Sequence, residues 1–150
     1  MNNIDFLLID DDRNQELLFI EAINEINETT DLNITYKVVK TPESAMIELY
    51  QNYFKAIIID LKLNNDDNAV ESDEEISGNI LLRRIIEKEI VPIVVITGFP
   101  DKVSTDIDKS IVKVLPKETN LYDEINALIE KYSDSVFKIF GSRGEINKNI

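Results

Sequence analysis

The residues best suited to chemistry are acids, a hydroxyl and an amine that each follow a short apolar run of the sequence. They are Asp10, Asp11, Asp60, Thr97 and Lys117. Crowded carboxylates repel one another, and a hard cation such as Mg²⁺ relieves that repulsion through oxygen ligands. An aspartate beside such a cation can attack phosphorus, while an ammonium and a hydroxyl offset the charge of the phosphoryl oxygens. The set therefore predicts metal-assisted phosphoryl transfer.

Within this set the carboxylates divide into a nucleophile and metal ligands. Asp60 follows the apolar run 56–59 and is the expected phospho-acceptor. Asp10 and Asp11 are expected to hold Mg²⁺, with Mn²⁺ as the alternative ion, and Asp60 and the backbone carbonyl of Lys62 would complete the protein ligands. Asp12 is expected to cap the helix that follows it. Thr97 and Lys117 remain to bind the phosphoryl oxygens.

Short apolar runs alternate with longer amphipathic segments along most of the chain, and this alternation must position the polar set. The expected strands are 4–9, 34–39, 56–59, 91–96 and 111–115. The expected helices are 13–27, 42–54, 78–88, a short or loose one at 100–110, and 121–132. Apolar strands alternating with helices predict an α/β fold, a parallel sheet covered on both faces. The carboxyl ends of parallel strands share one edge, where ligands bind.

Composition narrows the class of protein. The chain has 150 residues, of which 43% are hydrophobic, so one domain with one core is expected. There is no histidine or cysteine, which excludes catalysis by a histidine or cysteine side chain and thiolate metal sites. The formal charge of −13 opposes binding to nucleic acid or to an anionic membrane. With no apolar stretch long enough to cross a bilayer and no signal-peptide pattern, a cytoplasmic protein is expected.

Five motifs in order resemble those of the response-regulator receiver family of two-component signal transduction. They are LLIDDD, AIIIDLKL, SGNILLRRI, VVITG and VLPKE, and they span roughly residues 4–132. The resemblance implies a flavodoxin-like three-layer sandwich whose five-stranded parallel sheet has the order 2-1-3-4-5. It also implies a phosphorelay phosphoprotein. Asp60 would receive its phosphoryl group from a histidine kinase or a histidine phosphotransfer protein, in a Mg²⁺-dependent and self-catalysed reaction followed by autodephosphorylation.

Two segments stand outside this pattern. We expect a receiver domain over residues 1–132, interrupted by an acidic loop insertion at 64–77 that holds six acids and no base. The segment 133–150 is expected to be a C-terminal extension, too short to be a separate effector domain. Sequence leaves open what the loop and the extension do.

Three departures from the receiver pattern affect output rather than chemistry. The loop after Asp60 is longer than usual, a proline precedes Lys117 instead of following it, and Val114 stands where an aromatic residue is common. They keep a second interpretation open: a pseudo-receiver that binds partners without being phosphorylated. An aspartyl-phosphate phosphatase is a third, opposed by Lys62 where such enzymes place a second acid. The downstream protein is not identified by sequence, and a homodimer is one option.

Overall fold

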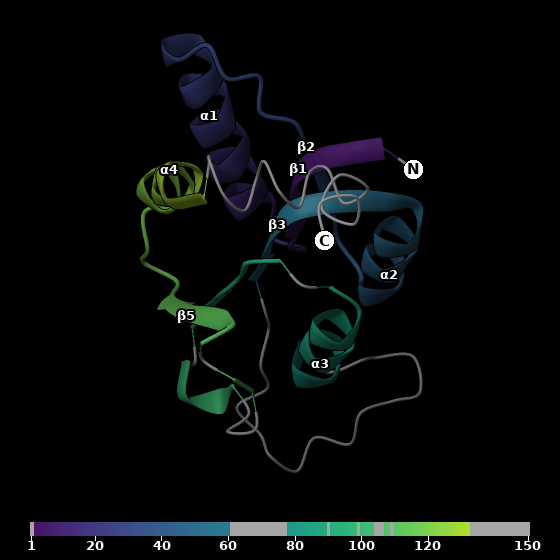
Figure 1. Ribbon diagram of the computed structural model, residues 1–150. Helices are drawn as coiled ribbons and strands as arrows, with labels where there is room; N and C mark the ends of the chain where they lie inside the picture. The colour runs from purple at the N-terminus through teal and green to yellow at the C-terminus, as the bar shows by residue number, and fades with distance from the viewer. Residues whose placement is uncertain are drawn as a thin grey trace.

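The computed structural model describes residues 2–60, 78–89, 91–98, 100–103, 107–108 and 110–132. The acidic loop 64–77, Lys62 and the extension 133–150 lie outside the described residues. Within the described part, one sheet organises the chain, and helices flank it on two sides (Figure 1).

The sheet has five parallel strands in the order β2-β1-β3-β4-β5, which confirms the predicted topology. The strands are β1 (Asn2–Ile9), β2 (Tyr36–Val39), β3 (Asn52–Asp60), β4 (Ile93–Thr97) and β5 (Val112–Pro116). Successive side chains of a strand point to opposite faces, so nearly continuous apolar strands fill both sides of the sheet.

Four helices cover the two faces: α1 (Arg13–Thr29), α2 (Pro42–Gln51), α3 (Gly78–Lys88) and α4 (Leu121–Tyr132). One core cluster joins the sheet to α2 and α3, and the other joins it to α1 and α4. Leu7 and Ile9 of β1 belong to the first cluster, whereas Phe6 and Leu8 belong to the second. This alternation confirms the three-layer sandwich, with α1 and α4 on one side of the sheet and α2 and α3 on the other (Figure 1).

Local sequence explains where the first two helices begin. The side chain of Asp12 accepts a hydrogen bond from the backbone N–H of Asn14 at 2.9 Å, so Asp12 caps α1 as predicted. Thr41 caps α2 in the same way through the N–H of Ser44, and Pro42 takes the first turn, where its missing N–H costs nothing. Both caps place the helix start directly after the carboxyl end of a strand.

The structure corrects the end of one predicted helix. The second helix ends at Gln51 instead of reaching Phe54, because residues 52–54 pair with the start of β1 and extend β3. Along α3, Leu81, Leu82 and Ile85 are buried, whereas Ile80 is 37% exposed. Within the expected helix 100–110, Pro100–Lys102 form a 3₁₀ turn, and residues 104–106 and 109 lie outside the described part of the chain. No described helix is both long and apolar enough to cross a membrane.

Candidate functional site

The best-defined contact of the site joins the ends of two strands that are not neighbours. The ammonium of Lys117, just after β5, donates a hydrogen bond to Oδ2 of Asp60, the last residue of β3. The Asp60 side chain is 4% exposed and that of Lys117 31%. The contact passes over the end of β4, so the carboxyl edge of the sheet brings together two predicted site residues.

Asp10 joins this pair from the central strand β1. It is 3% exposed, and its Oδ1 accepts a hydrogen bond from the N–H of Asp12 at 2.8 Å. Burial raises the pKa of Asp10 from 3.8 to about 7, and the charge of Asp60 and a hydrogen bond with it add to the rise. The Asp12 N–H and the charge of Lys117 act in the opposite direction. Asp10 and Asp60 are thus a pair of close, desolvated carboxyls.

The carboxyl pair fits a divalent cation. Oδ1 of Asp60 is buried and has no hydrogen-bond partner among the described residues, which leaves an acceptor lone pair unused. Mg²⁺ binds carboxylate oxygens, so it would give this oxygen a partner. It would also reduce the repulsion between Asp10 and Asp60, which adds to the effect of burial on the pKa of Asp10. Asp10 and Asp60 are the residues that would hold it. The backbone carbonyl of Lys62 falls outside the described residues.

Asp11, the third predicted carboxylate ligand, directly follows Asp10 in the sequence and differs from it in exposure. Its side chain is exposed, whereas Asp10 is buried. No group of three or more acids that could hold a metal occurs within the described ranges. Asp10 and Asp60 are therefore the two buried carboxylates of the site, and Asp11 stays a predicted ligand at its exposed side.

Thr97 lies where the sequence predicted, at the carboxyl end of β4. Its side chain is completely buried, and its Cα is paired in register with Pro116, the residue before Lys117. The register places Thr97 beside the segment that supplies the lysine. β4 itself lies between β3 and β5, so Thr97 shares the sheet edge with Asp60 and Lys117.

A tight turn holds Lys117. The N–H of Thr119 donates to the carbonyl of Pro116 at 3.1 Å, closing a turn around Lys117 and Glu118. Pro116 ends β5 in register with β4, which sets the direction in which the chain leaves the sheet. The exchanged order of proline and lysine therefore still delivers the ammonium to Asp60.

Glu16 also lies near this edge and was not predicted as a site residue. Glu16 lies in the first turn of α1, and its Oε2 is 3.2 Å from the guanidinium of Arg13 and 3.5 Å from the ammonium of Lys40. Its side chain is only 12% exposed. Lys40 follows β2 directly, so the rule that parallel strands end at one edge could have revealed this group too.

Comparisons with known proteins bear on the fold. No protein-family model matches the chain, and no curated protein matches it in sequence. Solved structures do match. The signal receiver domain of an HD-domain protein from Pseudomonas fluorescens superposes with a TM-score of 0.66 at 15% identity, covering 91% of this chain and 99% of that one.

Two further receiver structures carry a phosphate mimic. The BeF₃-activated receiver domain of nitrogen regulatory protein C superposes with a TM-score of 0.62 at 14% identity, covering 89% of this chain and 98% of that one. The response regulator TrrA from Thermotoga maritima, in complex with Mg²⁺ and BeF, superposes with a TM-score of 0.58 at 18% identity and covers 87% and 98%. The chain therefore has the receiver-domain fold, as its motifs predicted.

Proposed function

We propose that this protein is a phospho-accepting response-regulator receiver, with Asp60 as the acceptor, and that it acts as a signalling switch or relay. The observation that carries the proposal is the convergence of Asp10, Asp60 and Lys117 at the carboxyl edge of a receiver-type sheet. A buried carboxylate pair beside one ammonium suits phosphoryl transfer, which depends on positioning and charge compensation.

The proposed reaction moves one phosphoryl group between two proteins. An oxygen of Asp60 attacks phosphorus on a partner's phosphohistidine, the new O–P bond forms as the N–P bond breaks, and the histidine nitrogen keeps the electron pair. Lys117 moves its hydrogen bond from the carboxylate to a phosphoryl oxygen, and the Thr97 hydroxyl donates to another. Bound Mg²⁺, or Mn²⁺, would offset negative charge on the transferring oxygens. Water later hydrolyses the acyl phosphate.

The cofactor and partners follow from this chemistry. Mg²⁺ is proposed because Asp10 and Asp60 form a hard oxygen site, and Mg²⁺ is present in the TrrA complex. The phosphoryl donor would be a histidine kinase or a histidine phosphotransfer protein, as the resemblance to receivers implies, since this chain has no histidine to carry the group itself. A cytoplasmic location, an unidentified downstream protein and the option of a homodimer belong to the same proposal.

Beryllium fluoride, a mimic of the phosphoryl group, tests whether the site works as a unit. With Mg²⁺, saturating beryllium fluoride should raise the melting temperature of the wild type by about 5 °C or more, since ligand binding stabilises the folded state. Asp60→Asn should abolish the rise. The matched control is Asp31→Asn, an exposed acid between α1 and β2, which should respond like the wild type. A wild type that shows no Mg²⁺-dependent rise would contradict the proposal.

A second candidate is a pseudo-receiver that binds a partner through the same fold without phosphorylation. Its support is Val114, which stands where receivers commonly have an aromatic residue, together with the long acidic loop after Asp60. Equal binding of a partner by wild type and Asp60→Ala, with no response to beryllium fluoride, would favour this candidate.

A further inference from the structure

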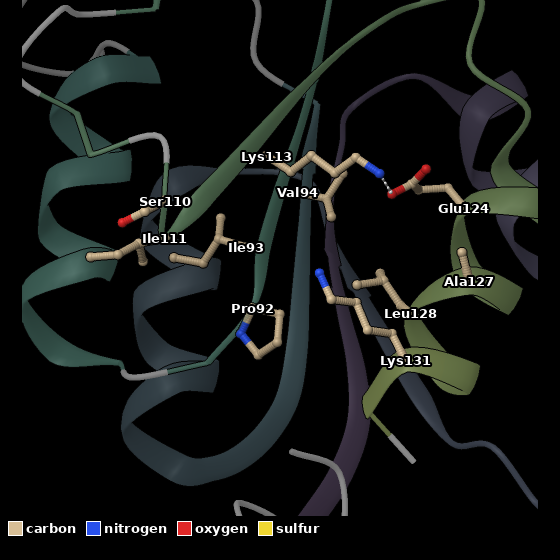
Figure 2. A pocket seen from close by; sticks show the side chains of 10 residues that line it. All are labelled: Pro92, Ile93, Val94, Ser110, Ile111, Lys113, Glu124, Ala127, Leu128 and Lys131. Atoms are coloured by element: carbon tan, nitrogen blue, oxygen red, sulfur yellow. Dashed lines mark hydrogen bonds and ion pairs between the residues drawn. The ribbon is translucent and has the colours of Figure 1, made fainter. Parts of the chain in front are cut away.

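A hollow lies away from the site, between α4 and the strands β4 and β5. It has a volume of about 260 Å³, and its apolar lining comes from Pro92, Ile93, Val94, Ile111 and Leu128. Figure 2 shows Ala127, Leu128 and Lys131 of α4 facing Pro92 and Ile93 across it. Ligand pockets usually hold roughly 300 to 1,000 Å³, so this hollow better suits one or two apolar side chains than a whole cofactor.

The hollow lies where α4 ends. Lys131, in the last turn of α4, lines it, and the helix ends one residue later at Tyr132. Ile111 lines the opposite side and is 44% exposed. The ion pair between Lys113 and Glu124, at 2.8 Å, lies along its border (Figure 2). Any segment that follows Tyr132 therefore starts next to an apolar hollow that the described residues leave open.

The chain beyond Tyr132 carries a matching segment. Residues 136–140, VFKIF, are the apolar run of the extension 133–150. Phe137 lies five positions after Tyr132, so an extended chain could carry it up to about 17 Å. Length and apolarity both suit the hollow.

We propose that residues 136–140 fold back within the same molecule and insert an aromatic side chain into this hollow. Tethering favours the chain's own segment over a second copy, because a short linker gives an effective concentration in the millimolar range. Burying one phenylalanine removes apolar surface from water, which opposes the entropic cost of ordering the segment. The extension thus covers the end of α4 and the exposed Ile111.

The topology argues against the other simple role for this segment, a sixth parallel strand beside β5. Parallel crossovers are right-handed in about 98% of cases. α1 makes such a crossover from β1 outward to β2. Because α4 covers the same face of the sheet as α1, a step from β5 outward in the opposite direction would be left-handed. Filling the hollow avoids that crossover.

Methyl resonances of the full chain test the insertion. In Phe137→Ala/Phe140→Ala, loss of the ring currents should shift the methyl signals of Ile93, Ile111 and Leu128 but leave Ile47 on α2 unchanged. The matched control, Ile146→Ala/Ile150→Ala, removes two apolar side chains elsewhere in the extension and should shift none of them. Pocket methyl signals that do not change in the double phenylalanine variant would overturn the proposal.

Two further measurements test whether the inserted side chain comes from the same molecule and whether the hollow is its binding site. The methyl signals of Ile93, Ile111 and Leu128 in the wild type should not depend on protein concentration. If dilution moves them to the positions seen in the double phenylalanine variant, the inserted side chain comes from a second copy and the proposal is overturned. Ala127→Glu places a charge in the hollow at an exposed helix position. It should speed chymotrypsin cleavage after Phe137 and Phe140 by about tenfold or more. Equal cleavage rates, with unchanged far-UV circular dichroism, would also overturn it.

Discussion

Lys117 donates a hydrogen bond to Oδ2 of Asp60, although the two residues are 57 positions apart in the sequence. The contact crosses the end of β4 and compensates the charge of the proposed acceptor before any phosphoryl group arrives. Phosphorylation would have to move the lysine from the carboxylate to a phosphoryl oxygen. Phosphorylation of Asp60 would therefore change the position of a side chain at the end of β5.

Removal of the Lys117 ammonium should destabilise the domain and impair phosphorylation. Lys117→Ala leaves a 4%-exposed carboxylate without its cation, which should cost about 1 to 3 kcal/mol in the free energy of unfolding. Lys113→Ala, also on β5, breaks a more exposed ion pair with Glu124 and should cost about 1 kcal/mol or less. Urea denaturation measures both. Similar losses in the two variants would contradict the special role of Lys117.

Metal-free stability should fall as pH rises, because of Asp10. Its pKa is raised to about 7 in the folded protein, against 3.8 as the ordinary value, so unfolding releases a proton between these values. The stability held below pH 4 is therefore lost progressively up to about pH 7. Asp10→Asn should remove that component, on the order of 2 to 4 kcal/mol at most. The measurement is urea denaturation with a chelator at several pH values.

The pH prediction is tested by comparing Asp10→Asn with the wild type at each pH. The difference in unfolding free energy between Asp10→Asn and wild type should grow as pH rises from 4 to about 7 and then level off. A difference that stays constant over this range would show that Asp10 titrates normally. Added Mg²⁺ should reduce the difference above pH 7, because the cation offsets the charge of the ionised pair.

Asp10 and Asp12, two positions apart, should have different roles: Asp10 belongs to the site and Asp12 caps α1. Asp12→Ala removes the acceptor for the N–H of Asn14 and should lower the free energy of unfolding by about 1 kcal/mol. It keeps the backbone N–H that Asp10 accepts, so phosphorylation should be nearly unchanged. Asp10→Asn should instead weaken Mg²⁺-dependent phosphorylation strongly. The measurement is phosphorylation by acetyl phosphate at several Mg²⁺ concentrations. Equal losses of phosphorylation in the two variants would contradict the different roles of Asp10 and Asp12.

The Thr97 hydroxyl should matter to the reaction more than its methyl group. Thr97→Ala should slow phosphorylation on the order of tenfold or more, because one donor to a phosphoryl oxygen is lost. Thr97→Ser keeps the hydroxyl and should retain most of the rate. Time courses with acetyl phosphate distinguish them. A rate in Thr97→Ala equal to that of the wild type would exclude Thr97 from the phosphoryl site.

Sequence patterns predicted the sheet because its strands are unusually clear. β1, β3 and β4 each contain an uninterrupted apolar run, 6–9, 56–59 and 93–96, that is followed directly by a polar site residue, and the five motifs indicated their order. The end of α2 could not be read in this way. Phe54 fits an amphipathic helix by spacing, and only its pairing partner in β1, Ile4, shows that the residue belongs to a strand. Tertiary pairing, not local propensity, decides that boundary.

The candidate site was predictable to the extent that parallel strands end at one edge. That rule brings Asp10, Asp60 and Lys117 together, but it says nothing of burial or exact direction. Asp11 follows Asp10 in sequence yet is exposed, because the backbone turns into the cap of α1 at that point. The turn that positions Lys117 depends on the hydrogen bond from the N–H of Thr119 to the carbonyl of Pro116. No sequence pattern predicts this hydrogen bond.

Locating the phosphoryl group tests the central claim most directly. The wild type, treated with acetyl phosphate and Mg²⁺, should gain a single phosphoryl group by intact mass, and peptide mapping should place it on Asp60. Asp60→Asn should gain none, and neither should wild type with excess chelator. Equal labelling of Asp60→Asn, or a phosphoryl group mapped to another residue of the wild type, would contradict the account.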